Sequence, residues 1–276
     1  MAEIWTMGEI LVEIMRPDVG IGLDETGLFK GPYPSGAPAI FIDSVARLDH
    51  SAGIIGGLGA DDFGRCVLKR LRDDGVDTSF ILEDDTGSTA VAFVTYFDDG
   101  SRRFIYHIDN TPAAKAKYRE DIPIDDSTKI FHIMGCSLMV NETFAGEIIS
   151  AAEHMASNGV KISIDPNIRP ELLKNRTLND VLGPALENCS ILMPGMSELK
   201  MLTGADSAEK GIEKLFDNDK LDLVVLKKGS EGAVIYSREE EISVPVYEVE
   251  EVDATGAGDC FDAGFLCGYL EGLSLD

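Results

Sequence analysis

The residues best suited to chemistry lie in one short segment. Residues 253–261 read Asp-Ala-Thr-Gly-Ala-Gly-Asp-Cys-Phe, and a helical pattern follows at 262–270. Small residues ahead of a helix leave backbone N–H groups accessible, and these groups bind anions together with the positive end of the helix dipole. A carboxylate at Asp259 would then accept a proton from a hydroxyl group that attacks a phosphate held there. The ordinary alternative is a glycine-rich turn with Asp259 as a helix cap.

Three further groups of polar residues come directly after apolar runs. Residues 227–233 carry two lysines and two glycines, which suit an approaching polyphosphate or form a simple tight turn. Asp165, Asn167 and Arg169 offer an acid, an amide and a guanidinium group to sugar hydroxyls and phosphate oxygens. Glu198 lies near a helix start, where a favourable interaction with the helix dipole is the alternative explanation. Loops at the carboxyl ends of parallel strands are where α/β proteins bind ligands.

The elements that must position these groups alternate between strands and helices. Short β-rich apolar runs predict strands at 4–7, 52–55, 130–134, 161–164, 191–193 and 223–226. Helical patterns lie at 38–48, 63–74, 142–157, 178–188, 198–202, 208–217 and 262–270. This alternation predicts an α/β fold with a mostly parallel sheet and helices on both faces.

One region breaks that alternation. Residues 89–97 and 103–108 are strand-like and are joined by Asp-Asp-Gly-Ser, which is a hairpin signal. Residues 11–15 form a further candidate strand of the same kind. Two interpretations stay open, namely a flap beside an active site and a decoration of the sheet edge.

Composition limits the function classes. The chain has 276 residues, 44% of them hydrophobic, and a formal net charge of −25, which together are typical of a globular protein of one or two domains. Such acidity argues against nucleic acid or an anionic membrane as partner, but not against a phosphorylated ligand held by backbone N–H groups. The five cysteines form no CxxC motif and the four histidines have no zinc-ligand spacing. No uncharged run approaches the roughly 18 residues of a membrane span, so we expect a soluble cytoplasmic protein.

Taken together, these segments resemble the ribokinase-like (PfkB-type) carbohydrate kinase family. Residues 253–261 are similar to its DTGAGD signature, 8–13 to its opening GE-x-L-x-D, and 31–48 to its GGAPAN segment. Residues 59–64, 165–169, 194–198 and 227–233 are similar to its G-x-D-x-x-G, DPN-x-R, N-x-x-E and TLG-x-x-G elements, in the same order. The resemblance spans essentially the whole chain and is greatest to the branch of 2-keto-3-deoxygluconate kinases and fructokinases.

The resemblance implies a single kinase domain over residues 1–276. Its fold would be a three-layer α/β/α sandwich with a nine-stranded sheet and a small β-sheet lid, formed by about residues 11–35 and 88–110. The implied reaction is transfer of the ATP γ-phosphoryl group to a hydroxyl group of a ketohexose, a pentose or a keto-deoxy sugar acid. The implied cofactors are ATP, Mg²⁺ and K⁺, and the implied assembly is a homodimer formed through the lid.

The resemblance also assigns roles by position, with Asp259 as the catalytic base. Gly256, Ala257 and Gly258 would form an anion hole, and Lys227, Gly229, Gly232 and Glu198 would bind the nucleotide, with Glu198 also organising Mg²⁺ through water. Asp253 and Thr255 would form a monovalent-cation site. The substrate would be bound by Glu13, Gly36, Tyr106, Asn167 and Arg169.

Several positions depart from the family pattern. Ile40 replaces the Asn of GGAPAN, Gly195 replaces the Asn of N-x-x-E, and Glu13 replaces an Asp. His107 stands where the ketodeoxygluconate kinases carry an Arg that binds the acid, which favours a neutral ketohexose or pentose. The C-terminal helices that relatives carry after the GAGD helix are expected to be absent here. A nucleoside kinase of the same fold, and a sugar-binding relative without catalytic competence, are therefore the alternatives.

Overall fold

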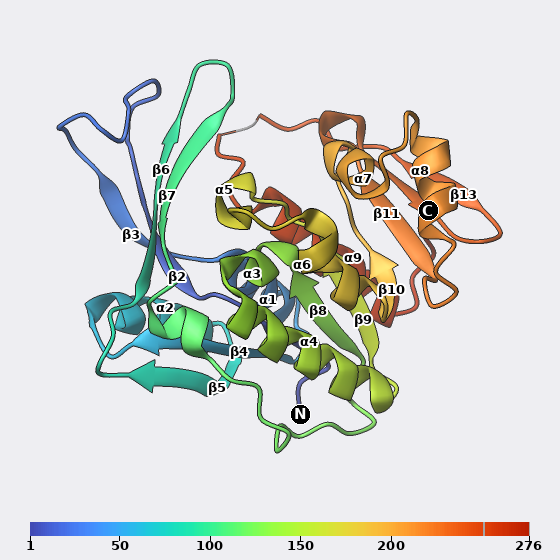
Figure 1. Ribbon diagram of the computed structural model, residues 1–276, viewed down its shortest axis with the longest axis horizontal. Helices are drawn as coiled ribbons and strands as arrows, with labels where there is room; N and C mark the ends of the chain where they lie inside the picture. The colour runs from blue at the N-terminus through green and yellow to red at the C-terminus, as the bar shows by residue number, and fades with distance from the viewer. Residues whose placement is uncertain (251, 276) are drawn as a thin grey trace.

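A nine-stranded sheet forms the centre of the molecule in the computed structural model, which describes residues 1–250 and 252–275 (Figure 1). Its strand order is β13-β12-β11-β10-β9-β8-β1-β4-β5. The strands are β1 (Ile4–Met7), β4 (Ala52–Gly59), β5 (Asp77–Asp84), β8 (Ile130–Met134), β9 (Lys161–Asp165), β10 (Cys189–Leu192), β11 (Leu223–Lys227), β12 (Ala233–Tyr236) and β13 (Glu241–Val244). The pairs from β5 to β11 are parallel, and β12 and β13 extend the edge in antiparallel fashion. The predicted mostly parallel sheet is confirmed.

Helices cover both faces of this sheet and bury a separate core on each. The first face carries α1 (Ala37–Arg47), α2 (Asp62–Asp73) and α9 (Ala257–Leu270). The second carries α3 (Gly135–Val140), α4 (Glu142–Ser157), α6 (Leu178–Leu186), α7 (Met196–Thr203) and α8 (Ala208–Leu215), while α5 (Pro170–Leu173) is a single short turn. Alternate strand residues serve the two cores, since Ile4 packs in the first and Trp5 in the second. The fold is the expected three-layer sandwich.

A second, smaller sheet stands beside the central one, at the left of Figure 1. Its order is β3-β2-β6-β7, with β2 (Leu11–Met15), β3 (Lys30–Ser35), β6 (Ala90–Tyr96) and β7 (Arg102–His107). Only residues 8–10 separate β1 of the central sheet from β2 of this one, so the two sheets are joined by a short connection. We call the smaller sheet the lid. The predicted hairpin is therefore part of a separate sheet and not a decoration of the central one.

The observed elements agree with the sequence pattern where that pattern was strong. The bounds of β1, β2, β8 and α4 are those predicted, whereas α9 begins at Ala257, five residues before the expected start. The sequence pattern missed β3, β5, β12, β13 and α3. In residues 1–250 and 252–275, no helix combines the length and apolar character needed to cross a bilayer.

Candidate active site

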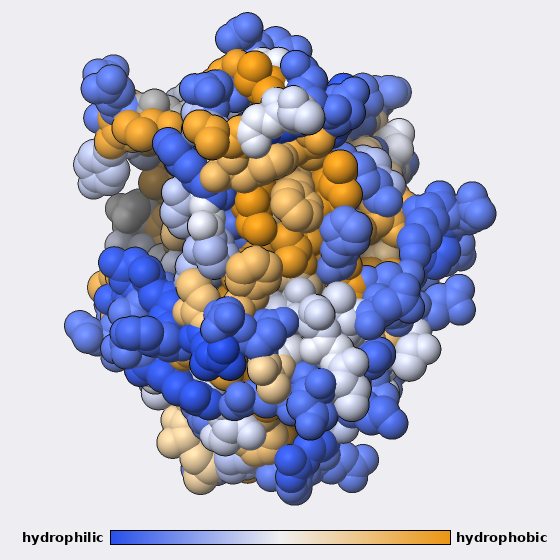
Figure 2. Space-filling model, turned by 90° about the vertical axis from the view of Figure 1, so that its left-hand side faces the viewer, coloured by the Kyte–Doolittle hydropathy of each residue, from blue (hydrophilic) through white to orange (hydrophobic). Residues whose placement is uncertain are grey.

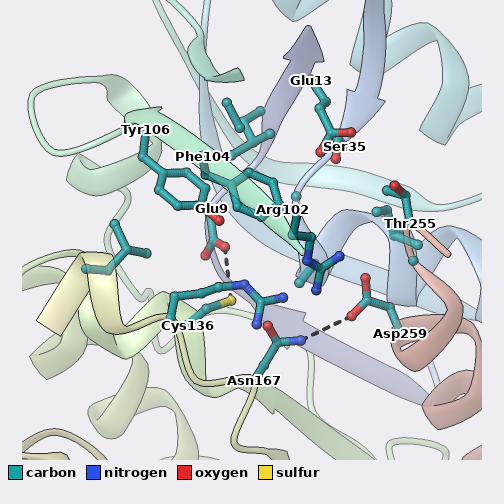
Figure 3. Close-up of a pocket in the computed structure, with 18 residues that line it drawn as sticks. Glu9, Glu13, Ser35, Arg102, Phe104, Tyr106, Cys136, Asn167, Thr255 and Asp259 are labelled. Carbon is teal, nitrogen blue, oxygen red and sulfur yellow. Dashed lines mark hydrogen bonds between the residues drawn. The ribbon is translucent and has the colours of Figure 1, made fainter. Parts of the chain in front are cut away.

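A pocket lies between the lid and the ends of the core strands, where loops of both sheets meet (Figure 3). Eight of the residues predicted from the sequence line it, namely Glu13, Gly36, Tyr106, Asn167, Arg169, Thr255, Gly256 and Asp259. These residues come from segments more than 200 positions apart in the chain. The fold therefore brings together the predicted base and the predicted substrate-side residues.

Asp259 lies in the first turn of α9, at the wall of this pocket. The helix is preceded by Gly256 in the left-handed conformation at φ 76°, and the Asp259 side chain is buried. Asn167 Nδ2 donates a hydrogen bond to Asp259 Oδ1 at 3.2 Å, drawn as a dashed line in Figure 3. Burial and then the nearby Asp165 carboxylate raise the pKa of Asp259 to about 7. A carboxylate with this pKa is well suited to general base catalysis at neutral pH.

The raised pKa of Asp259 predicts an acid limb in the pH profile. Only the ionised carboxylate accepts a proton, so kcat/KM should rise about tenfold per pH unit and level off above the pKa of about 7. Glu13 has a pKa that burial, followed by the Asp253 charge, also raises to about 7. Profiles of the wild type and of Glu13→Gln separate the two, because the limb should persist in the variant. A limb near pH 4 in both proteins would contradict the assignment.

The three amides of the predicted anion hole lie at the start of α9. The Ala257 N–H donates to Ala254 O at 3.2 Å, so it has an acceptor within the chain. Gly256 and Gly258 are therefore the stronger candidates for anion binding in this turn.

The loop after β9 is held by Glu198 of α7. Glu198 Oε1 accepts from the Ile168 N–H at 2.8 Å, and Oε2 accepts from the Gly195 N–H at 2.8 Å. Asn167 in the same loop adopts φ 38°, and its N–H donates to Asp165 Oδ1 at 3.0 Å. Glu198 thus fixes the loop that carries Asn167 and Arg169, a role that the sequence did not reveal.

Lys227 lies behind the pocket wall and not in it. Its Nζ is 2.8 Å from Asp165 Oδ2 and 3.1 Å from Asp262 Oδ1. The turn at Gly258 is close by, since a Cβ added there would lie 3.9 Å from the Lys227 Nζ. The predicted nucleotide contact of Lys227 stays a prediction, and the ammonium group already has two carboxylate partners.

Six further predicted residues do not line the pocket, namely Ala257, Gly258, Glu198, Gly229, Gly232 and Asp253. Gly229 and Gly232 form the turn after β11 and have positive φ values of 59° and 89°. A Cβ added at Gly232 would lie 2.1 Å from Val244 O, so the close approach of β13 requires glycine there. Asp253 is exposed, and its Oδ1 accepts from the Thr255 N–H at 2.9 Å. The nucleotide and monovalent-cation roles of these residues stay predictions.

The lid supplies one wall of the pocket through alternate residues of its strands. Tyr106 and Phe104 of β7 stack with ring centroids 5.2 Å apart, and Arg102 follows them on the same face (Figure 3). Tyr96 of β6 hydrogen-bonds to Thr255 at 2.5 Å between the two hydroxyl oxygens. The lid is therefore bonded to the segment that carries the anion hole.

Glu9 is a pocket residue that sequence reasoning left without a role. It lies in the link between β1 and β2, and its buried carboxylate accepts from Ser137 Oγ at 2.5 Å and from Cys136 Sγ at 3.2 Å. Burial raises the pKa of Glu9. Gly36 packs against the same link, since a Cβ there would lie 2.6 Å from Glu9 O. Gly8 and Glu9, the first two residues of the GE-x-L-x-E segment, were the sequence feature that could have identified Glu9 as a pocket residue.

The positive charges in the pocket differ from the sequence-based expectation. His107 is exposed on the opposite face of β7 from Tyr106 and does not line the pocket. Arg102, which was not predicted, lines it together with the predicted Arg169, and both share the space with Glu9, Glu13 and Asp259. Together these groups offer many hydrogen-bond donors and acceptors, which is the chemistry that a polyhydroxylated ligand requires.

Known proteins share both the sequence pattern and the fold. The sequence profile described as pfkB family carbohydrate kinase matches residues 30–276. Fructokinase-1 of Oryza sativa subsp. japonica is 32% identical over 263 residues, covering 95% of this chain and 81% of that protein.

Two solved structures are similar throughout. A protein of E. coli described as a ribokinase II, solved with ATP and Mg²⁺, matches with a TM-score of 0.91 and 40% identity, covering 100% of this chain and 88% of that one. A fructokinase double mutant of Vibrio cholerae, solved with fructose, ADP and potassium ion, matches with a TM-score of 0.82 and 26% identity, covering 100% and 85%.

Proposed function

Because this chain belongs to the PfkB family of carbohydrate kinases, we propose that it transfers the γ-phosphoryl group of ATP to a hydroxyl group of a ketohexose, with fructose as the first candidate. The observation that carries the proposal is the position of Asp259. Its carboxylate lies in the first turn of α9 and lines the same pocket as Glu13, Asn167 and Arg169. The names of the similar proteins, among them several fructokinases, support a ketohexose as substrate.

In this proposal the chain acts mainly by positioning. Glu13, Asn167 and Arg169 orient the sugar so that one hydroxyl group points at Asp259, which takes its proton as the oxygen attacks phosphorus. The amides of Gly256 and Gly258 hold the migrating phosphoryl group. The lid residues Phe104 and Tyr106 exclude water, which limits hydrolysis of ATP.

Mg²⁺ fits this arrangement as a partner of the nucleotide. No group of three or more His, Cys, Asp or Glu residues suited to a metal ion exists within 1–250 and 252–275. Mg²⁺ bound with a nucleotide needs only one or two carboxylates, since phosphates and water supply the other ligands. Glu198 would hold the ion through water, and the ion would supply positive charge at the phosphates. Asp253 and Thr255 are the candidates for a K⁺ site.

The test is a screen of ADP release with wild-type protein, ATP and Mg²⁺. The panel contains fructose, other ketohexoses, pentoses, keto-deoxy sugar acids and nucleosides. We expect the highest kcat/KM with a ketohexose. A nucleoside as best substrate would favour the kinase alternative of the same fold, and sugar binding by calorimetry without turnover would favour a non-catalytic relative.

We further propose that two copies of this chain pair through the outer face of the lid. Figure 2 shows apolar side chains gathered on the side of the molecule that the lid occupies. Ile105 of β7 and Phe29, which contacts Phe93 of β6, are exposed there at 45% and 40%, and Leu28 beside Phe29 is exposed at 78%. An apolar surface of this kind is typical of an interface between proteins.

Charging this surface should separate the copies. Ile105→Lys places a cation in the middle of the proposed interface. At about 10 µM, a concentration at which a standard-size interface is occupied, we expect the wild type to be a dimer and the variant to be a monomer. The measurement is mass by light scattering after size exclusion. Met201→Lys is the matched control, because Met201 in α7 is exposed to a similar degree at 46% and lies outside the lid. A wild type that is monomeric at this concentration would count against the proposal.

A further inference from the structure

A buried ion-pair network lies directly behind the pocket, with Lys227 at its centre. Its Nζ contacts Asp165 Oδ2 at 2.8 Å and Asp262 Oδ1 at 3.1 Å. The side chains of Asp165 and Asp262 are 3% and 0% exposed, and that of Lys227 is 18% exposed. A carboxylate removed from water to this extent is stable only with a partner of opposite charge or a bound proton.

The three residues belong to three different elements. Asp165 ends β9 and Lys227 ends β11, with β10 between them in the sheet, while Asp262 lies in α9. Asp262 follows Asp259 by three positions, which places the two carboxyl groups on neighbouring parts of the first turns of α9. The Lys227 ammonium group therefore ties the start of α9 to two strand ends of the core.

A second path returns from the network to Asp259. Asp165 Oδ1 accepts from the Asn167 N–H at 3.0 Å, and Asn167 Nδ2 donates to Asp259 Oδ1 at 3.2 Å. The contacts thus form a closed ring that leaves α9 at Asp262 and re-enters it at Asp259. Such a ring restrains both the helix start and the orientation of the Asp259 carboxylate.

The protonation states within the ring follow from burial. Burial opposes the ionised form of Asp165, but the Lys227 charge and hydrogen bonds leave its pKa lowered. Burial and then the Asp165 charge raise the pKa of Asp262 well above its usual range. Within the ring, the charge of Lys227 therefore favours the ionised form of Asp165, whereas burial favours the protonated form of Asp262.

We propose that Lys227 is a positioning residue, which holds the Asp259 carboxylate and the first turn of α9 through Asp165 and Asp262, and is not a ligand of the nucleotide. The inference rests on the proposed function of the same pocket. A lysine that binds phosphate keeps its ammonium group available to the ligand. Here the buried side chains of Asp165 and Asp262 occupy that group, and releasing it would leave the buried Asp165 charge without a partner.

Several charged groups face Asp259 from the surrounding elements, and they determine how the pKa of Asp259 changes when Lys227 is replaced. They are Glu9 from the β1–β2 link, Asp165 from β9, Arg169 from the following loop, Lys227 from β11 and Asp262 from α9 itself. From the lid, Glu13 of β2 and Arg102 of β7 line the same pocket. Asp165 raises the pKa of Asp259 more than Lys227 lowers it. Loss of Lys227 would make Asp165 take up a proton, and the pKa of Asp259 would then fall.

The test compares Lys227→Met, Asp262→Asn and Asp262→Ala. For Lys227→Met we expect kcat to fall by about 10- to 100-fold, KM for ATP and sugar to stay within about threefold, and the acid limb to move to lower pH. Asp262→Asn should lose less kcat than Asp262→Ala, because the amide keeps one of the two oxygen acceptors that Asp262 offers to Lys227 Nζ, at 3.1 and 3.2 Å. For Asp262→Ala we expect kcat to fall by about as much as for Lys227→Met. Lys161→Met is the matched control, since Lys161 also pairs with an aspartate, Asp222 at 2.6 Å, but lies at the opposite end of β9 from Asp165.

The opposite pattern overturns the inference. A Lys227→Met enzyme with unchanged kcat and a KM for ATP raised about tenfold would make Lys227 a nucleotide ligand. Equal activity of Asp262→Ala and wild type would also contradict it. If Lys227→Met does not fold, the pair of Asp262 variants decides. If the wild type phosphorylates nothing in the panel, the proposed function fails alone. In that case the pKa of Asp259, measured by carboxyl NMR in the wild type and in Lys227→Met, tests the network, because we expect a lower pKa in the variant.

Discussion

Replacing Asp259 with Asn is expected to lower kcat by about 1,000- to 10,000-fold, a greater loss than we expect from any other single substitution in the pocket. The amide is isosteric with the carboxylate but accepts no proton at neutral pH. Asn167 Nδ2, 3.2 Å from Asp259 Oδ1, still finds an amide oxygen as acceptor, so the pocket should keep its shape. We therefore expect sugar and ATP binding, measured by calorimetry, to change by less than about threefold.

A matched control separates this loss from a general effect on helix starts. Asp62 lies at the first position of α2 and its side chain is 93% exposed, remote from the pocket. Asp62→Asn should have wild-type kcat. A value of kcat within about tenfold of wild type for the Asp259 variant would contradict its role as base.

Replacing Gly256 with Ala is expected to lower kcat by about 100- to 1,000-fold. Gly256 has φ 76°, and a Cβ there would lie 2.9 Å from Ile40 Cγ2. An L-residue in the left-handed region costs about 1 to 2 kcal/mol, and the contact with Ile40 adds to that cost. The first turn of α9 would shift to relieve both, which moves the amides of the proposed anion hole.

Two further variants show which of these causes dominates. Gly264→Ala makes the same chemical change within α9, at a position where an added Cβ meets no atom of the described chain within 4 Å, so it should leave kcat unchanged. Adding Ile40→Ala to the Gly256 variant removes the steric contact and retains the backbone strain. If the double variant recovers kcat only in part, the loss that remains is due to the strained φ at position 256. A wild-type kcat for Gly256→Ala itself would contradict a contribution of these amides to catalysis.

The strongly patterned elements were predictable because their burial is either continuous, as in β8, or periodic, as in α4. Strand β8 is apolar throughout except for His132, and α4 is a long amphipathic helix whose Asn141 cap accepts from the Phe144 N–H at 2.8 Å. The missed elements lack such signals. Strand β3 contains Pro32 and Pro34 and lies at the lid edge, and β13 is an exposed edge strand of four residues. Helix α3 has six buried residues and no polar face.

Individual site residues were predictable where a motif surrounds them, as with Asp259 and Asn167. Arg102 was not, because its place in the pocket depends on the alternation of β7 and on the register that pairs it with Tyr96. Asp262 was missed because helical spacing alone does not reveal a buried carboxyl group. Its partner Lys227 comes from a strand 35 positions earlier, a pairing that only the tertiary structure brings about.

The contact between α1 and α9 has a consequence for biosynthesis. Cys260 Sγ lies 3.3 Å from Ser44 Oγ, so helices from distant parts of the sequence share one surface. During translation the ribosome delivers α1 long before α9, so the side of α1 that packs on α9 stays uncovered in the nascent chain. Asp259 reaches its pocket only when α9 docks. Catalytic competence should therefore arise only with this late step of folding.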